Sequence, residues 1–582
     1  MKKIFKLLAV LSFASFSFVS CDLTLMPEDE TSPDKYFKTE SDLQLWSNQF
    51  YKDILLNAEY GSSTDVFLSN GVSAYVTGNR TPQTQSWSFT SLREINYMLE
   101  HLHQCEDAGV AKKYEAVGRF FRAYFYFKLV RVYGDVPYYD KVLGSTDPDI
   151  YKARDDRGYV MDKVLEDYEF AINNLPGTWE AMNTRVTKWA AMGYASRAAL
   201  YEGTFRKYHG MADADKYLAK AVEYSEQFID ASPFSLYSSG NTPYRDLFVS
   251  LNAITQEVVL ARHYDTAYSV FHSMGSTTEF GRASVTRRFI NHYLMADGTR
   301  FTDKSDWQTM GYMDETKNRD PRLAQTVMCP GYIQKGATVV TPCTYTSHTG
   351  YQPIKFVPEA SKCVSSSDDV DWALLRAAEV YLNFAEAKAE LAALGKGTIT
   401  QADLDKSINK IRKRAKMPNL VLADANANPC PYMVSCYPNV DKGANKGVIL
   451  EIRRERTIEL ALEQPCRSWD MFRWKEAKQC LQVVQPWYGV YIPGLGKYDT
   501  SGDGVADVEF IQDGSVVKIK SGTSVSEVTL SEGTSGYIVA YAAANYGTLW
   551  DDARDYLWPI PASQRELNPN LTQNPGYVDG VN

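Results

Sequence analysis

The sequence lacks several features that would place it in a common functional class. Its 7 histidines are not clustered and it has no Cys-x-x-Cys pair, so the spacings of a sulfur-bound zinc site are missing. No run of lysine or arginine is long enough to follow a phosphate backbone, and the net charge is −9, which argues against nucleic acid as a partner. Beyond the N-terminus, no segment approaches the roughly 18 uninterrupted apolar residues of a membrane-spanning helix.

Apolar and aromatic residues, by contrast, are plentiful. Hydrophobic residues make up 44% of the 582 positions, which is enough for a large buried core and excludes a disordered chain. The 39 tyrosines and 11 tryptophans supply many rings that carry a polar group. Such rings suit polar ligands, although most of them are expected to fill the core. Composition alone does not separate the two roles.

The N-terminus has the pattern of a bacterial lipoprotein signal. Lysines at positions 2, 3 and 6 precede an apolar stretch over 7–19 that is too short for a stable membrane anchor. The residues that follow, Phe-Val-Ser before Cys21, resemble a lipobox. We therefore expect a signal peptide at 1–20, lipidation of Cys21 and a lipidated tether at 21–34, because several acyl chains on one residue give a lasting anchor. The alternative is an ordinary secretory signal followed by a chance cysteine.

The cysteines after position 21 suggest no defined set of disulfides. Cys430 and Cys436 flank a short segment that contains proline and could be joined in an oxidising compartment. Small buried thiols would explain them equally well. Both readings remain open from the sequence.

Helical periodicity dominates two long stretches of the chain. Apolar residues recur every three to four positions, or on nearly every face, over 41–55, 86–102, 114–133, 159–175, 187–204, 213–231, 372–393 and 402–415. Neighbouring segments form pairs, and 187–231 places small residues where two helices must approach closely, which is typical of tetratricopeptide repeats. These patterns predict helical repeats over about 35–231 and 372–480.

The remaining stretches lack a helical period. Short β-branched runs, glycine, serine and polar residues fill about 233–370 and 481–550. Long insertions of this kind in a compact domain are usually functional. We therefore predict a mainly α fold, with one domain over 35–582 in which a tetratricopeptide-like scaffold carries long, irregular, loop-rich insertions that face the ligand.

Paired carboxylates raise the alternative of an exported glycoside hydrolase. Glu455 and Glu459 are one helical turn apart, but arginines surround them and would keep both ionised, whereas a glycosidase acid needs a raised pKa. We interpret the two as partners in buried ion pairs. Asp320 with Arg322, and Asp470 with Arg473, are likewise expected to form structural pairs. No enzymatic activity is predicted.

One loop resembles the first part of a calcium-binding loop. Asp499, Ser501, Asp503 and Asp507 occupy positions one, three, five and nine, with Gly504 at six. Position twelve, where a bidentate glutamate is required, holds phenylalanine. A solvated turn explains the loop better than calcium, which stays an alternative, and no other cofactor is expected.

Nine segments in order resemble the SusD/RagB family of nutrient-binding lipoproteins, and together they span the chain after the lipobox. They are PEDETSPDKYFKTESDL, WSFTSLREINYMLEHL, RFFRAYFYFKLVRVYGDVPYY, RVTKWAAMGYASRAALY, YLMADGTRF with NRDPRL, LLRAAEVYLNFAEAKAE, INKIRKRAKMP, IRRERTIELALEQPCRSWDMFRW and WPIPASQRELNPNLTQNPGY. The resemblance implies a SusD-like fold with four tetratricopeptide-like units. It also implies a lipid anchor in the outer membrane, exposure at the cell surface, and a SusC-like TonB-dependent transporter as partner. Most members bind oligosaccharides, and some bind peptides or glycoproteins.

The ligand residues are assigned by region. A sugar presents an apolar face and a rim of hydroxyls, so a binder needs exposed rings beside polar side chains. The loop before the second helix has this composition, and the resemblance implies that the ligand face draws on this loop and on the region after the second repeat. The candidates are Tyr75, Asn79, Arg80, Trp87, Tyr264, Tyr268, Trp307 and Tyr312. Peptide import, and a scaffold that binds only a protein partner, remain alternatives to glycan binding.

Overall fold

The computed structural model places most of the chain. It describes residues 36–60, 63–69, 80–179, 182–281, 283–345, 347–440, 443–463, 466–483, 487–511, 515–518, 525–540 and 550–579. Cys21, Tyr75 and Asn79 lie outside these ranges, so the predictions made for them stay predictions. Among the described helices, none is long and apolar enough to cross a membrane.

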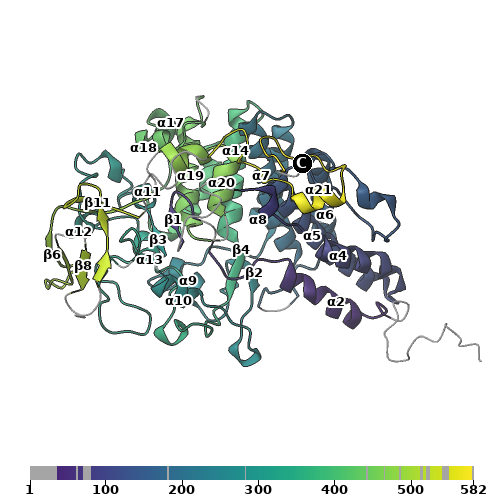
Figure 1. The fold of residues 1–582 in the computed structure, drawn as a ribbon, viewed down its shortest axis with the longest axis horizontal. Helices are drawn as coiled ribbons and strands as arrows, with labels where there is room; N and C mark the ends of the chain where they lie inside the picture. The colour runs from purple at the N-terminus through teal and green to yellow at the C-terminus, as the bar shows by residue number, and fades with distance from the viewer. Residues whose placement is uncertain are drawn as a thin grey trace, which may run out of the picture.

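The first part of the scaffold is a series of long helices. They are α2 (Glu40–Asp53), α4 (Thr90–His101), α5 (Ala108–Tyr133), α6 (Arg157–Asn174), α7 (Lys188–His209) and α8 (Ala214–Ala231). Sequence neighbours pack against each other, α5 on α6 and α7 on α8, and Figure 1 shows the whole group at one end of the molecule. The predicted helical pairs are therefore confirmed.

Helix α5 begins earlier than its apolar pattern indicated. The Asp107 carboxylate accepts hydrogen bonds from the backbone N–H groups of Gly109 and Val110, so the helix starts at Ala108 instead of 114. It ends at Gly134, whose φ of 76° is accessible to glycine at little cost. Because neighbouring helices cover it, residues on nearly every face of α5 are buried, as the sequence predicted.

Small residues allow α7 and α8 to approach closely. A Cβ atom on Gly203 of α7 would lie 2.7 Å from the Leu218 side chain and 2.8 Å from its backbone nitrogen on α8. Only glycine fits this contact without displacing the partner helix. The close approach that the tetratricopeptide-like pattern predicted is therefore present.

The second part of the scaffold is more broken than the sequence suggested. It contains α14 (Ala377–Ala393), α15 (Gln401–Lys406), α16 (Ile408–Arg414), α17 (Leu422–Ala427), α18 (Pro431–Cys436), α19 (Lys446–Glu459) and α20 (Cys466–Arg473). The predicted helix over 402–415 is interrupted at Ser407, whose φ and ψ are −125° and −92°. Cys430, just before α18, and Cys436, its last residue, are buried free thiols.

The predicted helix over 372–393 was wrong at its start. Trp372–Arg376 forms strand β4, which pairs in antiparallel orientation with β2 (Val258–Arg262). Three of its five residues are buried, so its hydrophobic pattern cannot be distinguished from a buried helical turn by periodicity. The partner strand lies more than a hundred residues earlier in the chain, which is why the local pattern misled.

The insertion over 481–550 forms small antiparallel sheets in its described parts. One sheet has the order β10 (Thr529–Leu530), β11 (Gly536–Val539), β5 (Tyr488–Ile492), and a second has the order β6 (Gly496–Tyr498), β7 (Val508–Phe510), β8 (Ser515–Lys518), β9 (Val525–Glu527). Figure 1 places β6, β8 and β11 at the end of the molecule opposite α4 and α21. This region is therefore more regular than the loops predicted for it.

The insertion over 233–370 consists of short elements. They are α9 (Pro243–Val249), β2, α10 (Met274–Phe280), β3 (Ser284–Val285), α11 (Arg287–His292), α12 (Tyr312–Glu315), α13 (Leu323–Thr326) and the 3₁₀ turns η5 (Thr266–Tyr268), η6 (Phe301–Asp303) and η7 (Ala360–Lys362). Strand β3 pairs with β1 (Phe67–Leu68). This pairing places residues 65–68 beside the start of α11, where the Thr286 N–H donates to the Val66 carbonyl.

The C-terminal segment returns to the first helices. Trp558 donates its backbone N–H to Val132 at the end of α5, and the Asn568 amide donates to the Lys152 carbonyl at 2.9 Å. Between these contacts lies α21 (Ala562–Leu567), near the 3₁₀ turns η2 (Pro82–Thr84) and η4 (Pro148–Tyr151). The remaining short turns are η3 (Leu102–Gln104) and the π-turn η8 (Gln479–Val483). Chain segments more than 400 residues apart thus build one end of the molecule.

Candidate functional site

The paired carboxylates of α19 lie inside a buried ion-pair network. Glu455 is 2.6 Å from Arg322 Nη1 and accepts from Arg412 Nε at 2.9 Å, and Glu459 is 2.6 Å from Arg376 Nη1 and also pairs with Arg414. Burial would raise the pKa of both carboxyl groups, but the guanidinium charges hold it below the ordinary value. Both groups therefore stay ionised, which confirms their structural interpretation.

The two other predicted pairs are also present. Arg322 Nη2 lies 2.7 Å from Asp320 Oδ2, and Arg473 Nη2 lies 2.7 Å from Asp470 Oδ1. Asp470 additionally accepts from Arg456 of α19, so the pair ties α20 to the scaffold. All of these side chains are buried, where ion pairs need several partners to offset the loss of water.

Arg80, a predicted ligand contact, lies in the interior. Its Nη2 atom is 3.1 Å from Asp555 Oδ1, and its guanidinium lies 5.6 Å and 5.5 Å from the ring centres of Trp550 and Trp558. These contacts fasten the C-terminal segment to the chain before η2. A group so enclosed does not face solvent, so its role in this structure is packing.

Two of the predicted tyrosines are buried and one is exposed. The Tyr264 hydroxyl accepts a hydrogen bond from the Ala58 N–H at 3.0 Å, and the Tyr312 hydroxyl donates to the Met328 carbonyl at 2.6 Å. Neither ring faces solvent. Tyr268, at the end of η5, is 80% exposed. The predicted set therefore does not form one surface.

Trp307 lies beside a group of tyrosine rings that the sequence did not indicate. Its half-buried indole packs edge-on against Tyr432, with ring centres 5.8 Å apart. Its carbonyl accepts from Arg287 Nη2 at 2.8 Å, and the Arg287 guanidinium lies 5.1 Å from the centre of the Tyr537 ring. We call Arg287, Trp307, Tyr488, Tyr491 and Tyr537 the tyrosine face.

An irregularity in strand pairing aligns the three tyrosines. Tyr491 of β5 is the partner of Tyr537 on β11, but the register shifts before the next pair, Val539 with Tyr488. Residues three apart normally point to opposite sides of a strand, and the shift brings both onto the partly exposed side. The Tyr488 and Tyr537 rings stack at 4.8 Å, and Tyr491 packs against Tyr537 at 5.4 Å and 72°.

A glycine permits this arrangement. The backbone at Gly489 lies against Thr349, and a Cβ atom would be 1.8 Å from the Thr349 carbonyl oxygen. That carbonyl accepts the Val490 N–H at 2.9 Å. Only glycine allows so close an approach, so the position of β5, and with it the tyrosine face, depends on residue 489.

A buried cation supports the tyrosine face, and unused polar groups lie at its edge. Burial would lower the pKa of Arg287, but Tyr351 and Glu315 raise it above its ordinary value, so the guanidinium is always charged. The Tyr537 hydroxyl donates to the Gln308 carbonyl at 2.6 Å, and burial raises its pKa.

The hydroxyls of Tyr488 and Tyr491 and the Gln308 amide have no partner among the described residues. Apolar rings edged by such groups can pack against a sugar ring and hydrogen-bond its hydroxyls.

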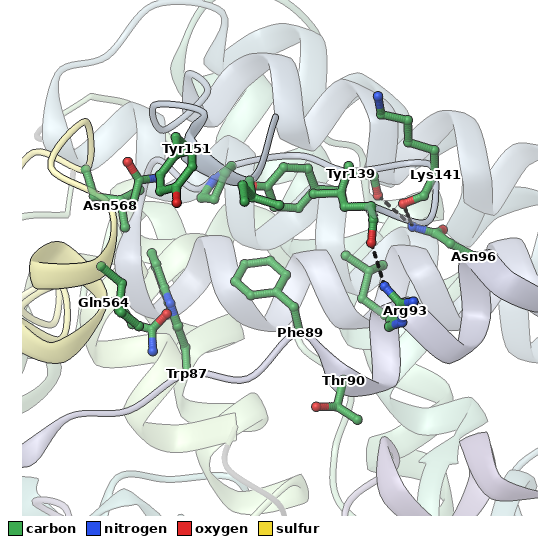
Figure 2. Close-up of a pocket in the computed structure, with 16 residues that line it drawn as sticks. Trp87, Phe89, Thr90, Arg93, Asn96, Tyr139, Lys141, Tyr151, Gln564 and Asn568 are labelled. Atoms are coloured by element: carbon green, nitrogen blue, oxygen red, sulfur yellow. Dashed lines mark hydrogen bonds between the residues drawn. The ribbon is translucent and has the colours of Figure 1, made fainter. Parts of the chain in front are cut away.

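Trp87 lies elsewhere, in a hollow at the opposite end of the molecule. The hollow has a volume of about 540 Å³ and is formed by the start of α4, the segment 137–151 and α21 (Figure 2). The Trp87 ring packs edge-on against Phe89 and Tyr133, at 5.6 Å and 5.3 Å. The structure thus separates Trp87 from Trp307, which the sequence had grouped together.

The loop that resembles a calcium site hydrogen-bonds to itself. Asp507 Oδ2 accepts from the N–H groups of Thr500 and Ser501, and Asp499 accepts from those of Gly502 and Gly504. Asp503 accepts from Val505. Within the described residues, no three histidine, cysteine, aspartate or glutamate side chains are grouped to hold a metal ion. Calcium binding here stays an untested alternative to the predicted turn.

Sequence reasoning missed Tyr488, Tyr491, Tyr537 and Arg287. The only local signal was the repeated tyrosine in the run YGVYI, which also reads as a buried strand. The face exists because β5 pairs with a strand nearly fifty residues later, and a single sequence does not reveal such a pairing.

Comparison with known proteins gives one consistent fold. The profile of the SusD family matches residues 256–577, and a profile described as starch-binding and associating with the outer membrane matches residues 35–200. No curated protein matches the sequence.

Solved structures cover nearly the whole chain. A SusD-like protein from Bacteroides fragilis is 20% identical, covers 95% of this chain and 100% of its own, and has a TM-score of 0.68. A SusD-like carbohydrate-binding protein from the same organism is also 20% identical, with coverage of 92% and 99% and a TM-score of 0.63. A laminarin-binding SusD-like protein is 17% identical, with coverage of 93% and 100% and a TM-score of 0.54. At these identities, the likeness establishes the fold.

Proposed function

We propose that this chain, which belongs to the SusD family, captures an oligosaccharide at the tyrosine face. It then delivers the oligosaccharide to a SusC-like TonB-dependent transporter. The carbohydrate-binding and laminarin-binding relatives support a glycan as ligand. Association with the outer membrane is the family description, and lipidation at Cys21 with exposure at the cell surface is the specific form that we propose.

The observation that carries the glycan assignment is the stack of Tyr488 on Tyr537 beside Trp307 and Arg287. Ring packing within the protein holds the two tyrosines in place, so a ligand would spend little free energy on ordering them. The free hydroxyls and amide at the edge suit a ligand rich in hydroxyl groups. The chain carries out no chemistry in this proposal, which the ionised carboxylates of α19 support.

Calorimetric titration of the mature chain carrying Cys21→Ala, against plant, host and microbial oligosaccharides, tests the proposal. We expect binding to one glycan class and a loss of affinity of roughly tenfold or more in Tyr488→Ala, because one stacking ring is removed. Phe280→Ala is the matched control, since this ring is 69% exposed and lies in α10, outside the tyrosine face.

Peptides belong in the same panel. Binding to peptides alone would replace the glycan assignment by peptide import, and unchanged glycan affinity in Tyr488→Ala would place the site elsewhere. Release of reducing sugar during the titration would show an enzyme and contradict the proposal. If a palmitate analogue labels Cys21→Ala as strongly as the unmodified chain, lipidation at Cys21 is contradicted.

A further inference from the structure

The hollow that contains Trp87 is a second concave surface, and it is distant from the tyrosine face. Figure 1 shows α21, which forms one of its walls, at the opposite end of the molecule from β11. Its volume of about 540 Å³ falls within the range of small-ligand sites.

Aromatic and aliphatic side chains form most of its surface. Figure 2 shows Tyr151 and Asn568 across the hollow from Trp87 and Gln564 at one end, and Phe89 between this end and Arg93. Aliphatic residues complete the walls; they are Leu92, Pro137, Leu143, Ile150, Leu567 and Leu571. Rings on opposite sides leave a space in which a flat apolar face can pack on both of its sides.

Several polar groups in the hollow make no hydrogen bond among the described residues. They are the Trp87 indole N–H, the hydroxyls of Tyr139 and Tyr151, and the Gln564 side-chain amide. All of them are partly or well exposed at the surface of the hollow. These groups are therefore available to hydroxyls or ring oxygens of a ligand.

The hollow contains one positive charge without an acidic partner in the described chain, on Arg93. No aspartate or glutamate is among its lining residues. Lys141 is neutralised, because its ammonium group lies 3.0 Å from Asp147 and 2.9 Å from Asp149. Arg93 donates one hydrogen bond to the Leu143 carbonyl at 2.7 Å and has no acidic partner in the described chain.

The remaining N–H groups of Arg93 can receive an anion. A carboxylate matches a guanidinium in both charge and shape. Helix α4 begins at Thr90 in the same wall, and its N-terminus adds a small positive potential.

We propose that this hollow binds an acidic oligosaccharide, with one sugar ring between Trp87 and Tyr151 and the carboxylate of a uronic acid on Arg93. The opposed rings and free hydrogen-bonding groups favour a sugar, and the single unpaired cation favours an acidic one. This site is independent of the tyrosine face and does not require it to bind ligand.

Titration of the mature Cys21→Ala chain with a uronic acid oligosaccharide and with its neutral, carboxyl-reduced counterpart tests this assignment. We expect the acidic form to bind at least roughly tenfold more tightly, because a charge-assisted hydrogen bond contributes on that scale. The preference should weaken as salt is raised, since Arg93 is exposed enough to be screened.

Two variants locate the site. Tyr151→Ala removes a ring that is 52% exposed, so folding should survive while binding of the acidic sugar is lost. Arg93→Gln should abolish the preference for the acidic form, and Arg93→Lys should restore most of it, because the charge is retained. Phe280→Ala should bind like the unmodified chain.

The outcomes separate this proposal from the one for the tyrosine face. Acidic binding that survives Tyr488→Ala but fails in Tyr151→Ala supports the hollow alone. Equal affinity for the acidic and neutral forms, affinity unaffected by Tyr151→Ala, binding only to acidic peptides, or no binding would each overturn the assignment of the hollow.

Discussion

Arg197 of α7 and Glu379 of α14 form a buried, two-pronged ion pair, with both N–O distances at 2.6 Å. Arg197 Nη2 also donates to the Leu374 carbonyl of β4 at 3.1 Å. One guanidinium thus connects the first helices, the second helical part and the strand between them. Burial would raise the pKa of Glu379, but Arg197 holds it below its ordinary value.

Removal of one partner of this pair should be far more damaging than removal of both. Glu379→Gln leaves the Arg197 charge buried and uncompensated, and we expect a loss of about 3–5 kcal/mol in the free energy of unfolding. The double change Arg197→Met with Glu379→Met should lose clearly less, because no charge is stranded. Urea denaturation measures both, and equal losses would contradict this account.

Glu386 should make the protein less stable in acid. Burial opposes ionisation, but Arg473 lowers the pKa of Glu386 to about 2. The ordinary, unfolded value is higher, so the contribution is fully present above about pH 4.5 and is lost as pH falls toward 2, amounting to roughly 3 kcal/mol. Glu386→Gln should flatten this part of the curve of unfolding free energy against pH.

Glu476 should make the protein less stable at high pH, the opposite of the effect of Glu386. Burial raises its pKa to about 7, and its Oε2 atom has no hydrogen-bond partner. A raised carboxyl pKa favours the folded state below about pH 4.5 and costs stability as pH rises through 7. Glu476→Gln should therefore stabilise the protein at pH 8, by up to about 3 kcal/mol, and change little at pH 4. Thermal unfolding at the two pH values tests this, and equal effects at both would contradict it.

Gly489→Ala should disrupt the tyrosine face. The new methyl group would meet the Thr349 carbonyl at 1.8 Å, so β5 must move away from its neighbour. We expect lower thermal stability and a loss of ligand binding at the face. Gly494→Ala, in the same segment, has no atom within 4 Å of the added Cβ and is the matched control. Normal binding in Gly489→Ala would show that the face does not depend on β5.

Calcium should have no effect on stability if the 499–507 loop is an ordinary turn. Its carboxylates already accept backbone N–H groups, so the melting temperature should be equal in calcium and in a chelator. Asp507→Asn should lower the melting temperature, because the Thr500 and Ser501 N–H groups lose a charged acceptor. The corresponding loss in unfolding free energy is about 1–3 kcal/mol. A rise of several degrees with calcium would establish the alternative.

The sequence by itself determined the scaffold. Long helices such as α5 and α8 follow from local apolar periodicity, and the small residues of α7 predicted its close approach to α8. The arginines around Glu455 and Glu459 likewise indicated buried ion pairs instead of catalysis. The helices were predictable because the residues that create them lie within a few turns of each other. The partners of Glu455 and Glu459 were not, because they are Arg322, Arg376, Arg412 and Arg414 from distant segments instead of the neighbouring arginines.

Only the tertiary structure decided the surfaces. Arg80 and Tyr264 have the composition of ligand residues, yet packing against distant segments buries them. Tyr488 and Tyr537 meet through strands separated by nearly fifty residues, and Trp87 meets α21 across more than 400. The physical reason is that side-chain exposure depends on which distant segments pack together, and the local sequence pattern does not contain that information.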